Sequence, residues 1–386
     1  MPWKVSDPMT ERMYFVTRLE KGERMTDLCR EFGISRKTGY KFWERFKRQG
    51  VTALADEPRA PKRVARKTAE AMEQLLVEAR GQHPSWGGKK LKNVLEREHP
   101  EVKLPSASTV SAILKRHGLV KERRRRRHPA AQGGPLTAAQ SPNEVWAVDY
   151  KGQFRLGNRE YCYPLTATDL ASRFILAIEA LDGTDEEQAR SVFEDVFATY
   201  GLPTAIRSDN GPPFASQGLA SLTKLSAWWL RLGIRHERIE PGHPEQNGQH
   251  ERMHRTLKAE TARPARANVL QQQDRFDEFR EEFNEKRPHE ALDMKRPAEI
   301  YQPAERRLPD PLPELDYPLH DDVLVVGRNG HIRLPQGRQV FIANALVGHP
   351  VGLREQLDGT WLVTFVGLDL GTYDARLGSF EPLAAP

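Results

Sequence analysis

The stretch TAIRSDNGPPF, residues 204–214, decides how this chain arranges its acidic residues. Its first half is short and apolar, as in a buried strand, and Asp209 then begins an Asp-Asn-Gly sequence that is typical of tight turns. A strand that runs into an acidic turn places the carboxylate at its carboxyl end, where open α/β sheets carry their ligand sites. Asp209 is therefore a candidate site residue.

Two further acidic residues lie on either side of this stretch. Asp149 interrupts an otherwise apolar predicted strand, residues 145–150, and a carboxylate in such a strand is costly unless it has a partner. Glu251 lies in the first turn of a predicted helix that begins at about Gln249, after a loop rich in proline and glycine. The three acids are 60 and 42 residues apart in the chain.

The order of predicted elements around these acids indicates an RNase H-like sheet. Three predicted strands come first, and a helix, a strand, a helix, a strand and a helix follow them. The predicted strands are 145–150, 161–169, 173–181, 204–207 and 234–238, and the predicted helices are 185–200, 215–232, one from about 249, and 269–285. We therefore expect a multidomain α/β protein whose catalytic core is a mixed five-stranded sheet with helices, preceded by helix-turn-helix domains and followed by a small β-barrel.

Five segments are predicted along the chain. Turn signals, including Asn329-Gly330, separate five short strands in the tail and favour a small β-barrel. The segments are a helix-turn-helix domain (1–56), a second helix-turn-helix or winged-helix domain (64–120), a basic linker (121–142), an RNase H-like core (143–303) and a small SH3-like barrel (316–386).

The charge of the chain is concentrated at its front. Residues 1–130 hold 31 Lys and Arg against 16 Asp and Glu, whereas the whole chain has a net charge of only +6. A basic front half predicts a polyanionic partner, which helix-turn-helix domains identify as double-stranded DNA. Within the first domain, Gly33 supplies a turn and Ser35 caps a basic helix, residues 36–48, that suits a major groove. A helical bundle with a solvated basic face is the alternative.

Eleven basic residues are candidates for DNA contact. They lie in that basic helix, at the start of a predicted helix in the second domain, and in an unbroken arginine run that can order against phosphates. They are Arg36, Lys37, Lys41, Arg45, Lys89, Lys90, Arg123, Arg124, Arg125, Arg126 and Arg127.

The composition of the chain argues against a membrane protein and against a metal site built from cysteines. No run approaches the ~20 apolar residues of a membrane helix, and the first residues lack a signal-peptide core, so we expect no membrane partner and a cytoplasmic location. Cys29 and Cys162 are too few for a cysteine zinc site. A metal must therefore be held by oxygen or histidine, and three carboxylates suit two Mg²⁺ (or Mn²⁺) ions that clamp a phosphoryl displacement.

Each acid also has an ordinary interpretation. Asp149 could only make hydrogen bonds at the end of its strand, Asp209 could only shape its turn, and Glu251 could be a surface residue of a helix. Asp169 is expected only to pair with Arg173. All three carboxylates in this strand order favour a catalytic set, in which Asp149, on the central strand, would bridge both ions.

Three sequence boxes carry a resemblance to known proteins. SDNGPPF (208–214) resembles the second-aspartate box of retroviral-type integrase cores, WAVDY (146–150) resembles their first-aspartate box, and HPEQNGQHER (243–252) resembles the box that holds the catalytic glutamate. MHRTLK (253–258) and FNEKRPHEAL (283–292) also resemble bacterial insertion-sequence transposases, in particular the insertion-sequence four-eighty-one-like group. The resemblance covers about residues 9–300.

The resemblance implies an activity and its machinery. It implies a transposase that binds terminal inverted repeats, exposes 3′-hydroxyls at the ends and joins them to target DNA with Mg²⁺ or Mn²⁺, as a dimer or tetramer on paired ends, associated with the bacterial nucleoid. Asp149, Asp209 and Glu251 fall on its catalytic and metal-binding positions. The interval from Asp209 to Glu251 is longer than in retroviral integrases, which predicts an insertion around 216–229 and makes Glu245 a rival third ligand.

Two other functions stay open at this stage. One is a DNA-binding regulator with an inactive integrase-like core, and the other is an RNase H-like nuclease that cuts without joining. Retention of all three carboxylates argues against the regulator, because unpaired acids near phosphate would weaken DNA binding.

Overall fold

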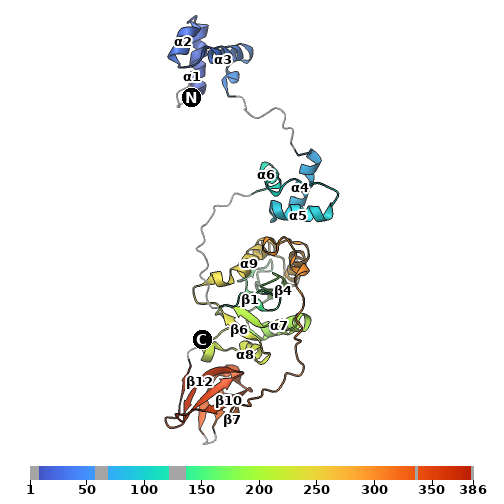
Figure 1. The fold of residues 1–386 in the computed structure, drawn as a ribbon, viewed down its shortest axis with the longest axis vertical. Helices are drawn as coiled ribbons and strands as arrows, with labels where there is room; N and C mark the ends of the chain where they lie inside the picture. Colours follow the sequence, from blue (N-terminus) through green and yellow to red (C-terminus); the bar gives the residue numbers. More distant parts are fainter. Residues whose placement is uncertain (1–7, 57–67, 121–135, 335–337, 384–386) are drawn as a thin grey trace. The chain divides into compact units, whose positions relative to one another are not determined.

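The computed structural model describes residues 8–56, 68–120, 136–334 and 338–383. The chain divides into two compact units, Met1–Thr68 and Ala69–Pro386, and Figure 1 shows their elements in chain order.

The first unit is built from three helices, α1 (Pro8–Glu20), α2 (Met25–Glu31) and α3 (Arg36–Gln49). The predicted turn and cap are confirmed: Gly33 has φ 63°, and the Ser35 side chain accepts a hydrogen bond from the Thr38 amide at 3.1 Å. Gly39 of α3 lies against α2, where a Cβ would come within 2.7 Å of Cys29 Sγ. Glycine at this position therefore lets the two helices pack closely.

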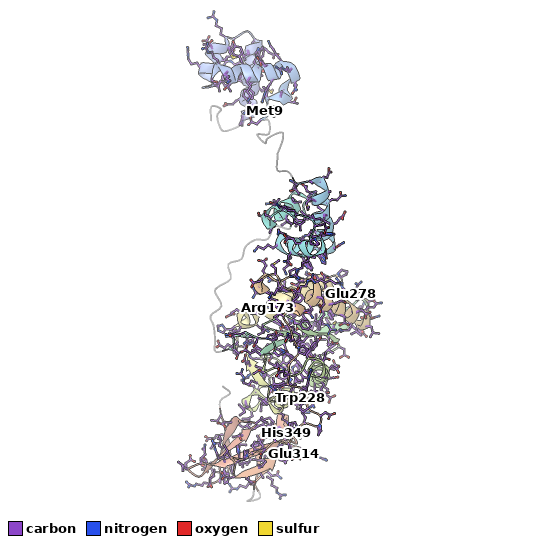
Figure 2. The ribbon with its side chains drawn as sticks, turned by 45° about the vertical axis from the view of Figure 1, so that its right-hand side comes forward. Met9, Arg173, Trp228, Glu278, Glu314 and His349 are labelled. Atoms are coloured by element: carbon purple, nitrogen blue, oxygen red, sulfur yellow. The ribbon has the colours of Figure 1, made fainter. Side chains whose placement is uncertain are left out.

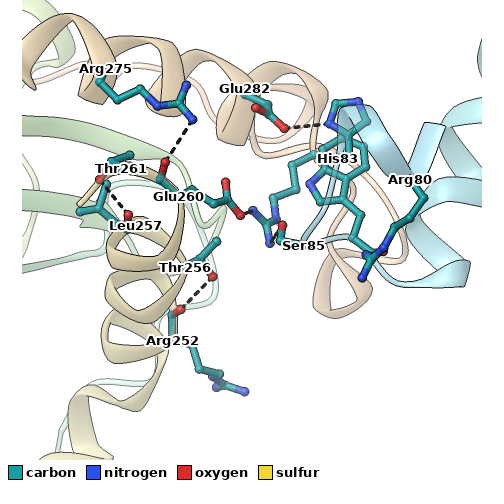
Figure 3. Close-up of polar contacts among 12 residues, drawn as sticks. Arg80, His83, Ser85, Arg252, Thr256, Leu257, Glu260, Thr261, Arg275 and Glu282 are labelled. Carbon is teal, nitrogen blue, oxygen red and sulfur yellow. Dashed lines mark hydrogen bonds and ion pairs between the residues drawn. The ribbon is translucent and has the colours of Figure 1, made fainter. Parts of the chain in front are cut away.

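The second unit begins with another group of three helices, α4 (Glu70–Gln82), α5 (Gly88–Glu98) and α6 (Ala107–Arg116), which enclose Trp86. Polar contacts join this group to residues that follow the central sheet. His83 Nδ1 lies 2.9 Å from Glu282 Oε1, as Figure 3 shows, and Arg97 Nη1 lies 2.5 Å from Glu299 Oε1.

The central sheet contains the five predicted strands and one short extra strand. The five are β1 (Val145–Tyr150), β3 (Tyr161–Asp169), β4 (Ile175–Leu181), β5 (Ala205–Ser208) and β6 (Arg235–Arg238). The extra strand, β2 (Phe154–Arg155), pairs with the start of β3. β1 lies antiparallel to β3 and parallel to β5, so the sheet is mixed, as predicted.

Helices cover both faces of this sheet because its strands alternate apolar side chains to either side. On one face, Trp146 and Val148 pack with α7 (Glu186–Tyr200) and α8 (Lys224–Arg231); Trp228 of α8 is labelled in Figure 2. On the other face, Ile178 of β4 packs with α9 (Gly248–Thr261) and α10 (Val269–Glu281), and a π-helical turn, Glu282–Lys286, follows α10.

The predicted helix over residues 215–232 is wrong in its first half. Ala220 and Ser221 adopt left-handed backbone angles, with φ 48° and 54°, which end a short 3₁₀ turn (Leu219–Ser221). The helix begins only at Lys224, where Thr223 and Ser226 form a capping box. Leu222 of the preceding segment packs in the apolar cluster of the tail, so this stretch joins the core to the tail.

The tail forms small antiparallel sheets with two strands more than predicted. One sheet follows the order β13 (Ser379–Pro382), β12 (Leu368–Asp374), β11 (Thr360–Phe365), β10 (Pro350–Glu355), β7 (Asp322–Val325), and β8 (His331–Arg333) pairs with β9 (Gln339–Phe341). The turn at Asn329-Gly330 forms, with Gly330 at φ 74°, but its flanking strands β7 and β8 belong to different sheets. The predicted domain boundaries and closure into a barrel stay predictions.

Candidate active site and DNA-binding elements

β1 and β5 set two of the candidate acids side by side. In their parallel register Val145 pairs with Ala205 and Ala147 pairs with Arg207. The same register continued by two residues sets Asp149 beside Asp209. Both carboxylates therefore belong to one end of the sheet, where ligand sites form.

Asp209 directly follows β5, in a turn that hydrogen bonds hold in place. Its Oδ1 accepts from the Gly211 amide at 3.1 Å, and Asn210 Nδ2 donates to the Ile239 carbonyl at 2.6 Å. Asp209 thus does shape its turn, as one interpretation predicted. Its carboxylate is half-buried at the end of the strand.

Glu251 lies on an exposed position in the first turn of α9 and shares a cavity with Asp149. The cavity has a volume of about 700 Å³. The negative charge of Glu251 also reaches Asp149, whose pKa it raises.

The pKa of Asp149 is raised to about 7, first by burial and then by the charge of Asp209, with Glu251 adding to both. Two neighbouring carboxylates repel the negative charge of a third, and a bound divalent cation relieves this repulsion. The charges of Asp209 and Glu251 thus both act on Asp149.

Sequence reasoning missed the basic residues around this cavity. Lys151, Arg255, Lys258 and Arg263 line it together with the acids. Arg255 and Lys258 follow Glu251 by four and seven positions, which places all three on one side of a helix, so helical spacing could have found them. Cations beside the acids suit a phosphate group that must approach the carboxylates.

A pair of buried histidines behind Asp149 was also missed. His250 and His254 are one turn apart on the buried side of α9, and their rings lie 4.5 Å apart. Both Nε2 atoms contact Thr166 Oγ1, at 2.8 Å for His250 and 2.6 Å for His254, and Thr166 is the β3 partner of Asp149. Burial lowers the pKa of both histidines, that of His250 to about 3. The spacing of two histidines around Glu251 was the available signal.

The rival third ligand and the weaker candidate have other partners. Glu245 Oε1 lies 2.7 Å from His243 Nδ1 in the loop before α9. The Asp169 carboxylate accepts hydrogen bonds from the Asn143 amide at 2.8 Å and from the Ser172 amide at 2.7 Å. Asp169 therefore caps the turn that follows β3, and its charge also acts on Arg173, so the expected pairing is not its only role.

The candidate DNA-contacting residues lie in several settings. Arg36, Lys37 and Lys41 are exposed on α3, and Arg45 is half-buried on the same helix. Lys89 Nζ lies 2.9 Å from Glu290 Oε2. Lys90 lines a different cavity of about 230 Å³ with Arg173, Arg252 and Arg287, and burial lowers its pKa to about 8. The run Arg123–Arg127 lies outside the described residues.

The described helices and the family matches bear on the partners of the chain. No described helix is long and apolar enough to cross a membrane.

Residues 139–244 and 232–297 both match the family described as "Integrase core domain". Residues 11–62 match "Helix-turn-helix domain" and residues 38–114 match "Homeodomain-like domain". Such domains imply DNA binding, and an integrase-type core implies the use of a divalent metal.

Several curated proteins are similar to the chain. An uncharacterized 39.2 kDa protein of insertion element IS476 from Xanthomonas euvesicatoria is 28% identical over 234 residues, 60% of this chain and 64% of that protein. An uncharacterized 31.7 kDa protein of insertion element IS407 from Burkholderia multivorans is 26% identical, over 60% of this chain and 80% of that protein. The Gag-Pol polyprotein of baboon endogenous virus is 30% identical over 45% of this chain and 9% of the polyprotein.

Among solved structures, the catalytic core domain of HTLV-2 integrase in complex with magnesium aligns at 16% identity with a TM-score of 0.34, covering 43% of this chain and 100% of that one. A chain of the simian T-cell lymphotropic virus intasome aligns at 17% identity with a TM-score of 0.38, covering 78% of this chain and 100% of that one.

The chain thus carries an integrase core domain behind helix-turn-helix domains. The predicted resemblance to proteins of bacterial insertion elements with an integrase-type core is confirmed by the family matches and by the insertion-element relatives.

Proposed function

We propose that the chain is a DNA transposase that binds the terminal inverted repeats of its element, cleaves the ends to expose 3′-hydroxyls and joins them to target DNA. The observation that carries the proposal is the setting of Asp149. It lies beside Asp209 by strand register, shares a cavity with Glu251, and has a pKa raised to about 7 by burial and by these two carboxylates.

The donor set fits two Mg²⁺ or Mn²⁺ ions. Carboxylate oxygens are the ligands that these hard cations prefer, and a cavity of about 700 Å³ leaves room for ions, waters and a phosphodiester. Asp149, Asp209 and Glu251 would hold these ions. Bound there, the ions would polarise the phosphodiester and activate the attacking hydroxyl.

The basic residues of the cavity would bind and orient the DNA. Lys151, Arg255, Lys258 and Arg263 would hold phosphates next to the carboxylates. Arg36, Lys37, Lys41 and Arg45 of α3 would read the transposon ends in the major groove, and Lys89, Lys90 and Arg123–Arg127 would add phosphate contacts. Joining two ends at once requires two active sites, so we expect a dimer or tetramer on paired ends, in the bacterial cytoplasm at the nucleoid.

A strand-transfer assay tests this function. Full-length protein is incubated with Mg²⁺, a supercoiled plasmid and end-labelled duplexes taken from the DNA that flanks the gene. Labelled DNA joined to the plasmid is the expected product, and Asp149→Asn should yield none while still shifting the duplexes on a native gel. Nicked duplexes without joining would indicate a nuclease, and a gel shift without nicking would indicate a regulator; either overturns the proposal.

A further inference from the structure

The hydrogen bonds behind Asp149 fix the tautomer of His254. The Thr166 hydroxyl has one proton, which it donates to the Asp149 carbonyl oxygen at 2.9 Å. Thr166 Oγ1 must therefore accept from both histidines, so Nε2 of His250 and Nε2 of His254 each carry a proton. In a neutral imidazole the other nitrogen then has a lone pair.

The two histidines use this second nitrogen differently. Nδ1 of His250 accepts from the Thr168 hydroxyl at 2.7 Å, which completes its hydrogen bonds inside the protein. Nδ1 of His254 instead faces Asp149 Oδ2 at 3.6 Å. A lone pair that points at an ionised carboxylate oxygen is unfavourable unless a proton or a metal cation lies between them.

The distance and the setting both suit such a cation. Two atoms that bind one ion at about 2.1 Å are roughly 3.0–3.6 Å apart for bond angles between about 90° and 120°. His254 also lines the cavity that Asp149 and Glu251 share, although only 6% of its side chain is exposed. Its ring is held from behind by Thr166, in the way that outer-shell hydrogen bonds orient metal-binding histidines.

We propose that His254 binds, through Nδ1, the divalent ion held by Asp149, so that the carboxylate site has one nitrogen ligand. This inference rests on the proposed function, since it concerns the same metal site. His250 orients the helix but does not reach the ion, because Thr166 and Thr168 use both of its ring nitrogens.

A nitrogen ligand changes which metal the site prefers. Mg²⁺ prefers oxygen ligands, whereas imidazole suits first-row transition ions, and affinity rises from Mn²⁺ towards Cu²⁺. The site should therefore bind Mn²⁺ more tightly than Mg²⁺. Replacing His254 by asparagine should weaken Mn²⁺ binding by about tenfold or more and change Mg²⁺ binding less.

Pulsed electron paramagnetic resonance on Mn²⁺-loaded, tag-free, full-length protein tests the ligand directly. We expect a ¹⁴N coupling from a directly bound imidazole in the wild type, its loss in His254→Asn, and its retention in the matched control His99→Asn, whose exposed ring contacts Glu101. Should His254→Asn fail to fold, wild-type protein grown with ¹⁵N-histidine gives the same answer, because the ¹⁴N pattern must change to that of ¹⁵N.

The outcomes separate this inference from the proposed function. Mn²⁺ that binds in an Asp149-dependent way but shows no histidine nitrogen coupling overturns the ligand role of His254 and leaves the transposase proposal standing. Wild-type protein that binds no Mn²⁺ at all overturns both.

Discussion

The β1–β3 pair holds an aspartate towards each end, and the two aspartates have opposite surroundings. Asp169 pairs with Trp146 in the strand register, and Asp149 pairs with Thr166. Burial raises the pKa of both. Asp169 has no exposed surface and accepts hydrogen bonds from Asn143 and Ser172, whereas Asp149 is partly exposed and faces the charges of Asp209 and Glu251.

This contrast separates a carboxylate that the fold satisfies from one that we propose binds a metal ion. Burial alone does not distinguish them, since it is the first cause of the raised pKa at both positions. The neighbouring groups do distinguish them. A carboxylate that accepts hydrogen bonds from nearby donors is stable within the fold, whereas a carboxylate beside other negative charges is stabilised by a bound cation.

The largest expected difference between the two aspartates is in catalysis. Asp149→Asn should reduce Mg²⁺-dependent cleavage of the flanking-DNA duplexes by about a thousandfold or more, because an ion that contributes several kcal/mol to the transition state loses its bridging ligand. Asp169→Asn, measured at a temperature where it remains folded, should keep cleavage within about tenfold of wild type. Equal losses in both variants would show that the contrast has no catalytic meaning.

The third carboxylate is expected to have the next largest effect. Glu251→Gln should slow cleavage by roughly a hundredfold, about 3 kcal/mol, because Glu251 shares the cavity with Asp149. The matched variant Glu245→Gln should leave the rate nearly unchanged, since Glu245 contacts His243 in the loop. The reverse pattern would assign the third ligand to Glu245.

The raised pKa of Asp149 predicts a pH-dependent stability of the metal-free protein. Because the folded pKa, about 7, exceeds the ordinary value of 3.8, the folded state holds a proton that the unfolded state loses, and stability should fall as pH rises from about 4 to about 7. Asp149→Asn should therefore be more stable than wild type at pH 8 by about 4 kcal/mol, and the difference should nearly vanish near pH 4. Urea unfolding at both pH values, with EDTA present, measures it.

Added Mg²⁺ provides the check on that result. It should stabilise the wild type at pH 8 and have little effect on Asp149→Asn, because only the wild type retains the bridging carboxylate. A variant that is less stable than wild type at pH 8 without metal would contradict the electrostatic picture of the site.

Asp169 should show the smallest effect, and in stability alone. Asp169→Asn replaces an acceptor of the Asn143 and Ser172 amides by a group that also donates, which should cost about 1–2 kcal/mol in the free energy of unfolding. Urea unfolding at pH 8 should then rank Asp149→Asn above wild type and Asp169→Asn below it. A stabilised Asp169→Asn would mean that Asp169 is also an unsatisfied charge.

The sequence was informative where local patterns determine structure. Short apolar runs predicted β1 and β3 to the residue, and Ser35 predicted the start of α3. The sequence was misleading where distant contacts determine structure. Residues 215–232 have a helical pattern of apolar residues, but Ala220 lies in a left-handed turn and the segment beside it packs on the tail. Strands β12 and β13 were missed because their register depends on partners in the tail sheet.

The same division holds in the site. Motif and strand order predicted the three acids as one site, and the offset of 60 residues between Asp149 and Asp209 equals the β1–β5 register. The role of the three acids as metal ligands stays a prediction. The network of His250, His254 and Thr166 was not, because it requires knowing which side of α9 faces β3.

The most direct test is a crystal structure of the protein with Mn²⁺, in which anomalous scattering locates the ions. Strong anomalous peaks bounded by the carboxylates of Asp149, Asp209 and Glu251 are predicted, and they should disappear in Asp149→Asn crystals. Ordered carboxylates without a peak between them, or an ion held elsewhere at full Mn²⁺ occupancy, would contradict the assignment of these three acids as the metal site.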